Sequence, residues 1–145
     1  MRPEDLPQVA AIEAVSSLNP WSQQAFQAEL SASLVSQPLV VEGGREVIAF
    51  IIPWMVAGEL QIANFAVKPE YRKLGIGRML LTHVMQLARE NDCATAFLEV
   101  RASNLAARKL YRRLGFEEDG VRARYYSPGN EDAVLMRKDL KDEGQ

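Results

Sequence analysis

One stretch of this sequence changes its hydrophobic period twice, which sharply limits the folds open to the chain. Residues 60–67 and 94–100 are short runs rich in apolar side chains, typical of buried strands. Between them, from 75 to about 91, the apolar residues follow helical spacing, at Ile76, Met79, Leu80, Val84, Leu87 and Ala88. A strand–helix–strand unit of this kind packs as a right-handed crossover, with its two strands parallel.

Further helices and strands are predicted on both sides of this unit. Strands at 38–42 and 46–56, joined by a turn at Gly43 and Gly44, lead antiparallel into the strand at 60–67. Helices are predicted at 5–16, 22–33 and 103–114, with Asp5, Ser22 and Ser103 as N-caps and Gly115 as a C-terminal stop. Two last strands are predicted at 116–121 and 133–138. The order α-α-β-β-β-α-β-α-β-β predicts an α/β fold, a mixed sheet with helices on both faces.

Length and charge narrow the classes of function. The 145 residues predict a single domain over 1–145, with a polar tail at about 139–145 that frays. The net charge is −2, from 17 Lys and Arg against 19 Asp and Glu, so no basic excess points to nucleic acid as a partner. The single cysteine, Cys93, cannot form an internal disulfide, which suits a reducing compartment. No apolar run approaches the ~20 residues of a membrane span, and the acidic start is unlike a signal peptide, so we expect a cytoplasmic protein without a membrane partner.

The segment 67–78 has the features of a phosphate-binding loop. It joins a strand to a helix, and Gly75 and Gly77 lie where the first turn of that helix begins. The first N–H groups of a helix have no partner within it and carry partial positive charge, and glycines let a phosphate approach them. Nearby basic residues add positive charge: Arg72, Lys73 and Arg78. The alternative is an ordinary helix start with solvated basic residues, since the segment is not a Walker loop and a dinucleotide fingerprint would need glycine in place of Leu80.

A second group of polar residues begins at the end of the strand at 94–100. Glu99 lies at its carboxyl end, where open α/β sheets place their ligands, and a carboxylate there suits a general base. The alternative is a structural ion pair with an arginine at position 101 or 124. Asn104 either caps the next helix or bonds the amide groups of a ligand. Tyr111, two helical turns further along the same face, is either a proton donor or a core residue.

Taken together, these residues resemble the GCN5-related N-acetyltransferase superfamily. The stretches RKLGIG at 72–77 and NLAARKLYRRLGF at 104–116 match its R/Q-x-x-G-x-G/A and N-x-x-A-x-x-L-Y-x-x-x-G-F patterns. The stretch LEVRASN at 98–104 is similar to that of its bacterial members that acetylate the N-terminal alanine of ribosomal proteins. The family usually has a strand before its first helix. Here only Met1, Arg2 and Pro3 precede the helix, so we expect that strand to be short or missing.

The resemblance implies acetyl-CoA as donor and a set of site residues. Glu99 would be the general base and Tyr111 the general acid. The backbone of one strand would hold the acetyl and pantetheine end, at Phe65, Ala66 and Val67. The diphosphate would lie on the loop and helix tip, at Arg72, Lys73, Leu74, Gly75, Ile76, Gly77 and Arg78, and Asn104 would bond the pantetheine arm. No metal is expected, because the sequence offers no ligand cluster around His83 or Cys93.

The acceptor is expected between two aromatic walls. Trp21 and the first two helices are predicted on one side, with Tyr125 and Tyr126 on the other, although Trp21 could instead be a hydrophobic staple between the helices. The resemblance implies a protein N-terminus as acceptor, the N-terminal alanine of a ribosomal protein, and we expect a monomer. Two alternatives stay open. One is acetylation of a small-molecule amine or a lysine side chain, and the other is a CoA-binding module without catalysis, which would not need Glu99 and Tyr111.

Overall fold

The computed structural model describes residues 1–32, 34–126 and 131–141, except the side chains of Arg124 and Tyr126. Its helices are α1 (Leu6–Ser16), α2 (Gln23–Ser31), α3 (Ile76–Glu90) and α4 (Leu105–Arg113), with short 3-10 helices η1 (Pro3–Asp5) and η2 (Pro69–Tyr71). Its strands are β1 (Leu39–Gly43), β2 (Glu46–Val56), β3 (Glu59–Val67), β4 (Thr95–Arg101), β5 (Glu117–Tyr126) and β6 (Glu131–Asp139). The predicted order of helices and strands is confirmed, and the last two strands are longer than predicted.

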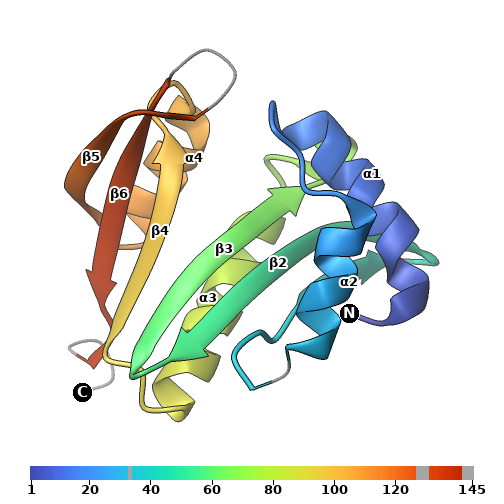
Figure 1. Ribbon diagram of the computed structural model, residues 1–145, viewed down its shortest axis with the longest axis horizontal. Coiled ribbons are helices and arrows are strands. Elements are labelled where there is room, and N and C mark those ends of the chain that lie inside the picture. Colours follow the sequence, from blue (N-terminus) through green and yellow to red (C-terminus); the bar gives the residue numbers. More distant parts are fainter. Residues whose placement is uncertain (33, 127–130, 142–145) are drawn as a thin grey trace.

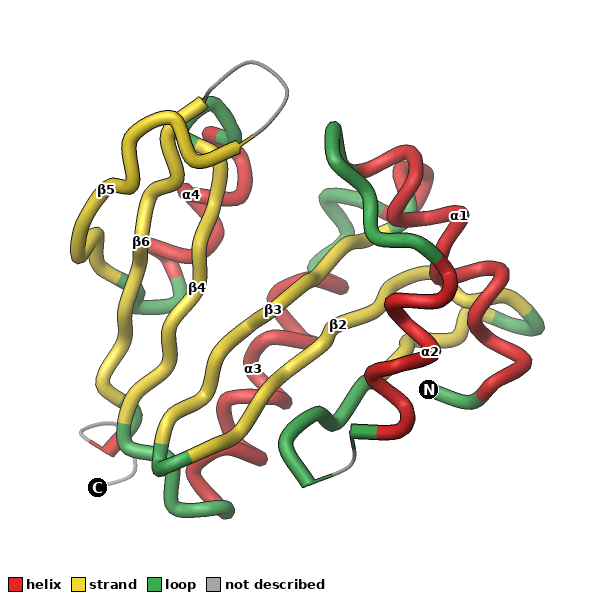
Figure 2. The backbone as a smooth tube through the Cα atoms, viewed as in Figure 1, coloured by secondary structure: helices red, strands yellow, loops and turns green. Residues whose placement is uncertain are grey.

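The six strands form one mixed sheet in the order β1-β2-β3-β4-β6-β5. β3 and β4 run parallel, as expected of strands joined through α3, and the other neighbouring strands run antiparallel. α1 and α2 cover one face of the sheet, and α3 and α4 cover the other (Figure 1 and Figure 2). The predicted mixed sheet with helices on both faces is therefore confirmed.

Two apolar clusters, one on each face, hold the layers together. On the side of α1 and α2, Phe26 lies edge-on to Phe50, with ring centroids 5.2 Å apart. On the other side, Ile51 of β2 packs in the cluster that contains Leu81 of α3. All four side chains are fully buried, and each such burial stabilises the fold by about 1.5–3 kcal/mol. β2 contributes to both clusters because successive strand side chains point to opposite faces.

A β-bulge in β3 interrupts this regular alternation. Ile52 pairs with Asn64 but Pro53 pairs with Ile62, so Ala63 is an extra residue on β3. Pro53 has no N–H group to donate, and proline within a sheet is found at such irregular positions. The bulge therefore lies where the sequence of β2 already weakens the ladder.

Just past the bulge, β3 and β4 diverge. Their parallel pairing ends at Ile62 with Leu98, although both strands continue for several residues. The two strands separate toward their carboxyl ends (Figure 1). In open α/β sheets, ligands bind at the carboxyl ends of the strands, so this divergence is the expected position for a site.

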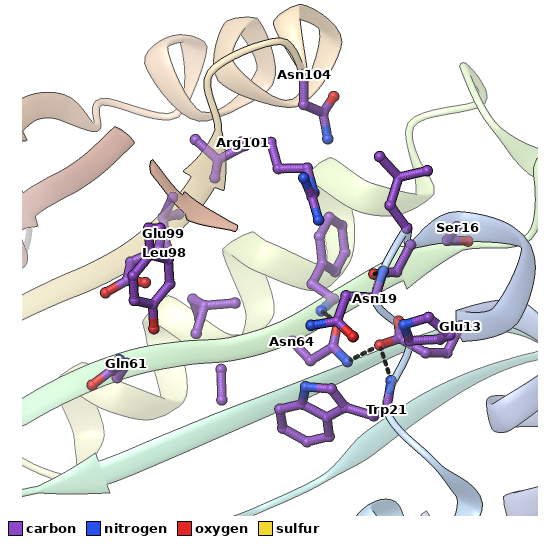
Figure 3. Close-up of a pocket in the computed structure, with 18 of the residues that line it drawn as sticks. Glu13, Ser16, Asn19, Trp21, Gln61, Asn64, Leu98, Glu99, Arg101 and Asn104 are labelled. Atoms are coloured by element: carbon purple, nitrogen blue, oxygen red, sulfur yellow. Dashed lines mark hydrogen bonds between the residues drawn. The ribbon is translucent and has the colours of Figure 1, made fainter. Parts of the chain in front are cut away.

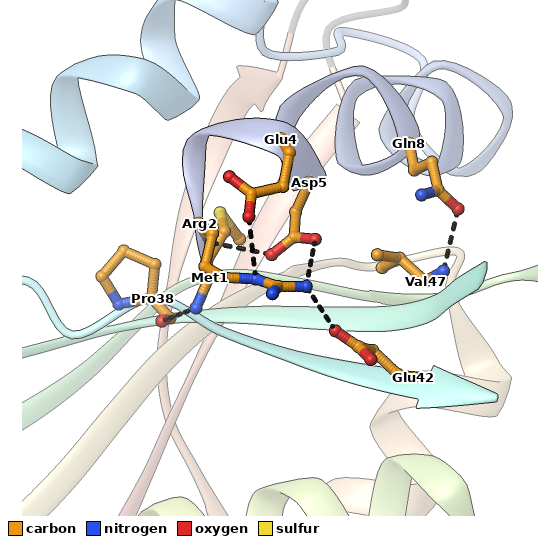
Figure 4. Close-up of polar contacts among 8 residues, drawn as sticks. All are labelled: Met1, Arg2, Glu4, Asp5, Gln8, Pro38, Glu42 and Val47. Atoms are coloured by element: carbon orange, nitrogen blue, oxygen red, sulfur yellow. Dashed lines mark hydrogen bonds and ion pairs between the residues drawn. The ribbon is translucent and has the colours of Figure 1, made fainter. Parts of the chain in front are cut away.

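The first residues form η1 rather than a strand, and polar contacts join them to the sheet (Figure 4). The amino group of Met1 donates to the carbonyl oxygen of Pro38 at 3.1 Å, and the guanidinium of Arg2 contacts the carboxylate of Glu42 at 3.1 Å. Asp5 is the N-cap residue of α1, as predicted, but its side chain makes no cap hydrogen bond. Its carboxylate instead accepts the backbone N–H of Arg2 at 2.7 Å, since that N–H comes at the start of η1.

The second helix begins as predicted. The hydroxyl of Ser22 accepts the N–H of Ala25 at 3.1 Å, and α2 ends at Ser31; position 33, the predicted end, and tail residues 142–145 lie outside the described residues. Within the described residues, no helix has the length and apolar character needed to cross a bilayer. The same residues contain no group of three or more His, Cys, Asp or Glu side chains that could hold a metal ion.

Candidate active site

A cleft of about 910 Å³ lies where β3 and β4 diverge (Figure 3). Its walls come from β2, β3, β4, β5, α4 with its N-cap, and the end of α1 with the loop that follows. Six of the residues predicted for the site line it: Trp21, Phe65, Glu99, Asn104, Tyr111 and Tyr125. Ala66, Val67 and the loop at 72–78 are not among the described residues that line it. The fold thus brings the proposed catalytic residues together and leaves the predicted diphosphate loop beside the cleft.

Glu99 faces the cleft because of its position in β4. The side chains at 96, 98 and 100 are buried on the face of the sheet that α3 and α4 cover. The alternate side chains of this strand, including that of Glu99, therefore point to the opposite face. The carboxylate of Glu99 forms an ion pair with the guanidinium of Arg122, from β5, at 3.5 Å. The sequence suggested Arg101 or Arg124 as that partner; Arg101 contacts Glu131 at 3.3 Å instead, and the side chain at 124 lies outside the described part of the chain.

Tyr111 is a core residue that also reaches the cleft. Its side chain is 7% exposed and belongs to the cluster under α3 and α4, where its ring meets that of Phe116 edge-on with centroids 6.0 Å apart. The same residue also borders the cleft. Its ring is therefore fixed by core packing, which is what a precisely placed proton donor needs.

Asn104, rather than Ser103, is the N-cap of α4. Its side-chain oxygen accepts the N–H of Ala107 at 3.2 Å. The N–H of Ser103 donates to the carboxylate of Glu131 at 2.5 Å. This bond fixes the backbone just before the first turn of α4. Hydrogen bonds from Ser103 and from the guanidinium of Arg101 keep the pKa of the Glu131 carboxyl below its usual range. The cap uses the oxygen of Asn104, and its carboxamide nitrogen takes no part in the cap.

The ladder between β2 and β3 shows which N–H groups of β3 face the open side. The N–H of Lys68 donates to the carbonyl oxygen of Ile48 at 2.7 Å. Because N–H groups alternate in direction along a strand, that of Ala66 also points to β2, and those of Phe65 and Val67 point to the diverging side. The N–H of Ala66 therefore does not face the open edge, and its side chain is buried on the face that α1 and α2 cover.

Arg72 lies across the end of β3 rather than at the helix tip. Its Nε donates to the carbonyl oxygen of Val67 at 2.9 Å, and one Nη donates to the hydroxyl of Ser16, at the end of α1, at 3.0 Å. The guanidinium therefore joins the last turn of α1 to the carboxyl end of β3. This position suits a residue that holds the loop in place.

The tip of α3 has the features of an anion site. Its first intrahelical bond joins the N–H of Met79 to the carbonyl oxygen of Gly75 at 3.0 Å, so the N–H groups of 76–78 precede the ladder. Gly75 has φ of +85°, where a side chain would be strained, and a Cβ built on it would meet nothing within 4 Å. A Cβ on Gly77 would come within 3.1 Å of the ring of Phe65. An open, positively polarised helix tip beside an extended edge fits the diphosphate and arm of acetyl-CoA.

Aromatic side chains form part of the wall of the cleft. Trp21 lines the cleft, and its ring also packs on that of Phe26 with centroids 5.3 Å apart. Trp21 is therefore a hydrophobic staple at the start of α2 and part of the wall of the cleft at the same time. Tyr125 is half-exposed, with the guanidinium of Arg122 lying 5.2 Å from its ring centroid. The side chain of Tyr126 lies outside the described residues.

Several lining residues were not predicted from the sequence, chiefly Glu13, Asn64 and Trp54. Glu13 follows Leu6 and Val9 at helical spacing on the buried face of α1, a face that the evenly apolar sequence of this helix does not mark. It is 3% exposed, and a buried carboxylate is costly unless it accepts hydrogen bonds. No local pattern marks Asn64 and Trp54 either, because both are placed by strand pairing.

Comparisons with known proteins agree with this geometry. Residues 6–116 match the family described as Acetyltransferase (GNAT) family. The ribosomal protein bS18-alanine N-acetyltransferase of Escherichia coli (strain K12) is 39% identical over 134 residues, covering 91% of this chain and 89% of that protein. The crystal structure of the ribosomal-protein-S18-alanine N-acetyltransferase from Escherichia coli matches with a TM-score of 0.88 at 34% identity, covering 97% of this chain and 90% of that one.

A Bacillus anthracis protein crystallised in complex with acetyl coenzyme A has a TM-score of 0.66 at 25% identity, with 72% of this chain and 62% of that chain covered. The match over residues 6–116 spans more than half of the sequence and includes the helix tip, α4 and every described residue that lines the cleft except Arg122 and Tyr125. The chain therefore belongs to the GNAT acetyltransferase family and is an N-acetyltransferase.

Proposed function

We propose that this enzyme transfers an acetyl group from acetyl-CoA to the N-terminal α-amino group of a protein, the N-terminal alanine of a ribosomal protein. The observation that carries the proposal is that Glu99 and Tyr111 line the same cleft, beside the open edge of β3. The name and the 39% identity of the Escherichia coli relative support the choice of acceptor.

Glu99 acts as the general base. The attacking amine must be neutral, and at pH 7 this costs about 1.4 kcal/mol for an α-amino group but about 4.6 kcal/mol for a lysine. A single carboxylate, acting directly or through one water, suits the first of these. Its position on β4, across the cleft from Trp21, leaves room for an acceptor N-terminus between them.

The open edge of β3 and the hydroxyl of Tyr111 stabilise the negative charge that develops on the thioester oxygen and on the departing sulfur. Backbone N–H groups at Phe65 and Val67 stabilise negative charge on the thioester oxygen. The hydroxyl of Tyr111 gives a proton to the departing thiolate. The N–H groups at the tip of α3 hold the diphosphate, and the carboxamide of Asn104 bonds the pantetheine arm.

The acceptor chain lies against aromatic side chains. Trp54 supplements Trp21 on this wall, and its indole N–H donates to the carboxylate of Glu29 at 2.5 Å, which fixes the ring. Tyr125 closes the opposite side. Rigid aromatic walls select the shape of the first residues of a peptide at low cost in conformational entropy.

Substituting Glu99→Gln tests the chemistry. We expect kcat/KM to fall about 10²-fold or more, while the Kd of acetyl-CoA by calorimetry stays the same. Glu118→Gln is the matched control, because this glutamate contacts Arg108 and Arg112 away from the cleft. Unchanged turnover in Glu99→Gln would remove this residue from the role.

A panel of acceptors tests the substrate. Peptides that begin with Ala-Arg, peptides with internal lysines, and polyamines are compared by kcat/KM with acetyl-CoA. We expect the N-terminal alanine peptides to be preferred. A preference for polyamines or internal lysines would overturn the acceptor, and binding of acetyl-CoA without any turnover would favour a non-catalytic CoA-binding module.

A further inference from the structure

The N–H of Phe65, which faces the open edge of β3, is bonded to a side chain. It donates to the side-chain oxygen of Asn64 at 2.8 Å. Its counterparts on the other edge of the strand donate to β2, as the N–H of Lys68 does to Ile48. An acceptor from the neighbouring side chain thus occupies the position that, in the proposed reaction, belongs to the thioester oxygen.

A buried carboxylate determines which way the carboxamide of Asn64 is turned. The nitrogen of Asn64 donates to Oε2 of Glu13 at 2.8 Å (Figure 3). The same oxygen accepts the backbone N–H of Trp21 at 3.0 Å. Because a carboxylate only accepts hydrogen bonds, it draws the nitrogen of Asn64 toward itself and leaves the oxygen directed at Phe65.

We propose that Asn64 is a positioning residue whose side-chain oxygen is exchanged for the thioester oxygen when acetyl-CoA binds. This rests on the proposed function, in which the thioester lies at the open edge of β3. An N–H in a partly buried cleft is costly to leave unpaired, so Asn64 keeps Phe65 bonded until the carbonyl replaces it. Glu13 holds the carboxamide close by for the return exchange.

The exchange predicts a particular effect on ligand preference. Free CoA has a thiol in place of the thioester and brings no carbonyl oxygen, so it leaves the bond between Asn64 and Phe65 intact. Acetyl-CoA gains one hydrogen bond and loses another, and its advantage over CoA is small. Without Asn64, acetyl-CoA gains the bond to Phe65 outright, while CoA gains nothing.

Calorimetry on the purified protein measures this effect. The Kd of CoA and the Kd of acetyl-CoA are determined for the wild type, Asn64→Ala and Gln61→Ala. Gln61 is the matched control, since it is a carboxamide on the same strand before the bulge. We expect the ratio of the Kd of CoA to that of acetyl-CoA to rise about 2- to 10-fold in Asn64→Ala and to stay unchanged in Gln61→Ala. Asn64→Val, with the same expectation, replaces Asn64→Ala if circular dichroism shows that variant to be unfolded.

Hydrogen exchange gives a second readout that needs no ligand. In the protein alone, the amide of Phe65 should exchange faster in Asn64→Ala than in the wild type, because it loses its acceptor. Suppose that the wild type binds acetyl-CoA but that Asn64→Ala changes neither the Kd ratio nor the hydrogen-exchange rate of the Phe65 amide. The proposed role of Asn64 is then overturned, and the proposed function stands. If the wild type binds no acetyl-CoA, both are overturned.

Discussion

Deleting Ala63 tests whether the bulge in β3 is what opens the cleft. With this residue present, Ile62 and Phe65 both pack on the side of α3, although they are three positions apart. In a regular strand, residues three positions apart lie on opposite faces. After deletion of Ala63 the two residues are two positions apart, so regular alternation keeps them on the same face and the bulge is no longer needed. The straightened strand would then continue pairing with β4 beyond Leu98, and the N–H groups of Phe65 and Val67 would enter that ladder.

The loss of affinity follows chiefly from the N–H of Val67, because the bond from Phe65 to the donor only replaces its bond to Asn64. A hydrogen bond to the donor has a net value of about 0.5–1.5 kcal/mol, so we expect the Kd of acetyl-CoA to rise about 2- to 10-fold. Calorimetry measures the Kd, and circular dichroism shows that the variant is folded. Hydrogen exchange should slow at the amides of Phe65 and Val67. Ala63→Gly is the control, because it keeps the length of the strand and thus the bulge.

A folded deletion variant that binds acetyl-CoA within about twofold of the wild type would refute the reasoning. So would amides at 65 and 67 that exchange as fast as before. Either result would mean that contacts on the helices, and not the extra residue in the strand, separate β3 from β4.

Three further substitutions test other parts of the site. Gly75→Ala should lower the free energy of unfolding by about 1 kcal/mol in urea, because φ is +85° but space is open; a loss above ~3 kcal/mol would show a clash. Tyr111→Phe should lower kcat about 10²-fold with little change in the thermal midpoint, and unfolding instead would support a purely structural role. Hydrogen bonds from Ser103 and Arg101 lower the pKa of the Glu131 carboxyl, so the ionised carboxylate stabilises the folded state. This contribution is complete above about pH 4.5, the ordinary value, and is lost as pH falls through the lowered pKa. The difference in unfolding free energy between wild type and Glu131→Gln should therefore shrink below about pH 4.5, and a constant difference would contradict this.

Local patterns predicted most helices and strands because their causes are local. Ser22 caps α2 through a bond three residues away, and the apolar spacing of α3 follows from its single buried face. β5 was predicted too short at its C-terminal end: the prediction stopped at 121, but pairing with β6, as of Tyr126 with Glu131, continues the strand to Tyr126.

The parts of the site that the sequence did not reveal depend on contacts between distant segments. Ala63 is small enough for either face of β3, so nothing in the sequence marks it as the extra residue. The pairing of Glu99 with Arg122 requires β5 to lie two strands from β4, across β6. Glu13 meets Asn64 only because α1 packs over β3.

The junction between β3 and β4 divides the sheet into two halves. In the described chain, these strands share four residue pairs, against eight between β2 and β3 and seven between β4 and β6. In the proposed function, one half carries the edge that binds the donor and the other carries Glu99 as the base, so the angle across this short seam would set the distance between base and thioester. Substitutions along the seam should therefore change donor affinity and turnover together, without touching either substrate.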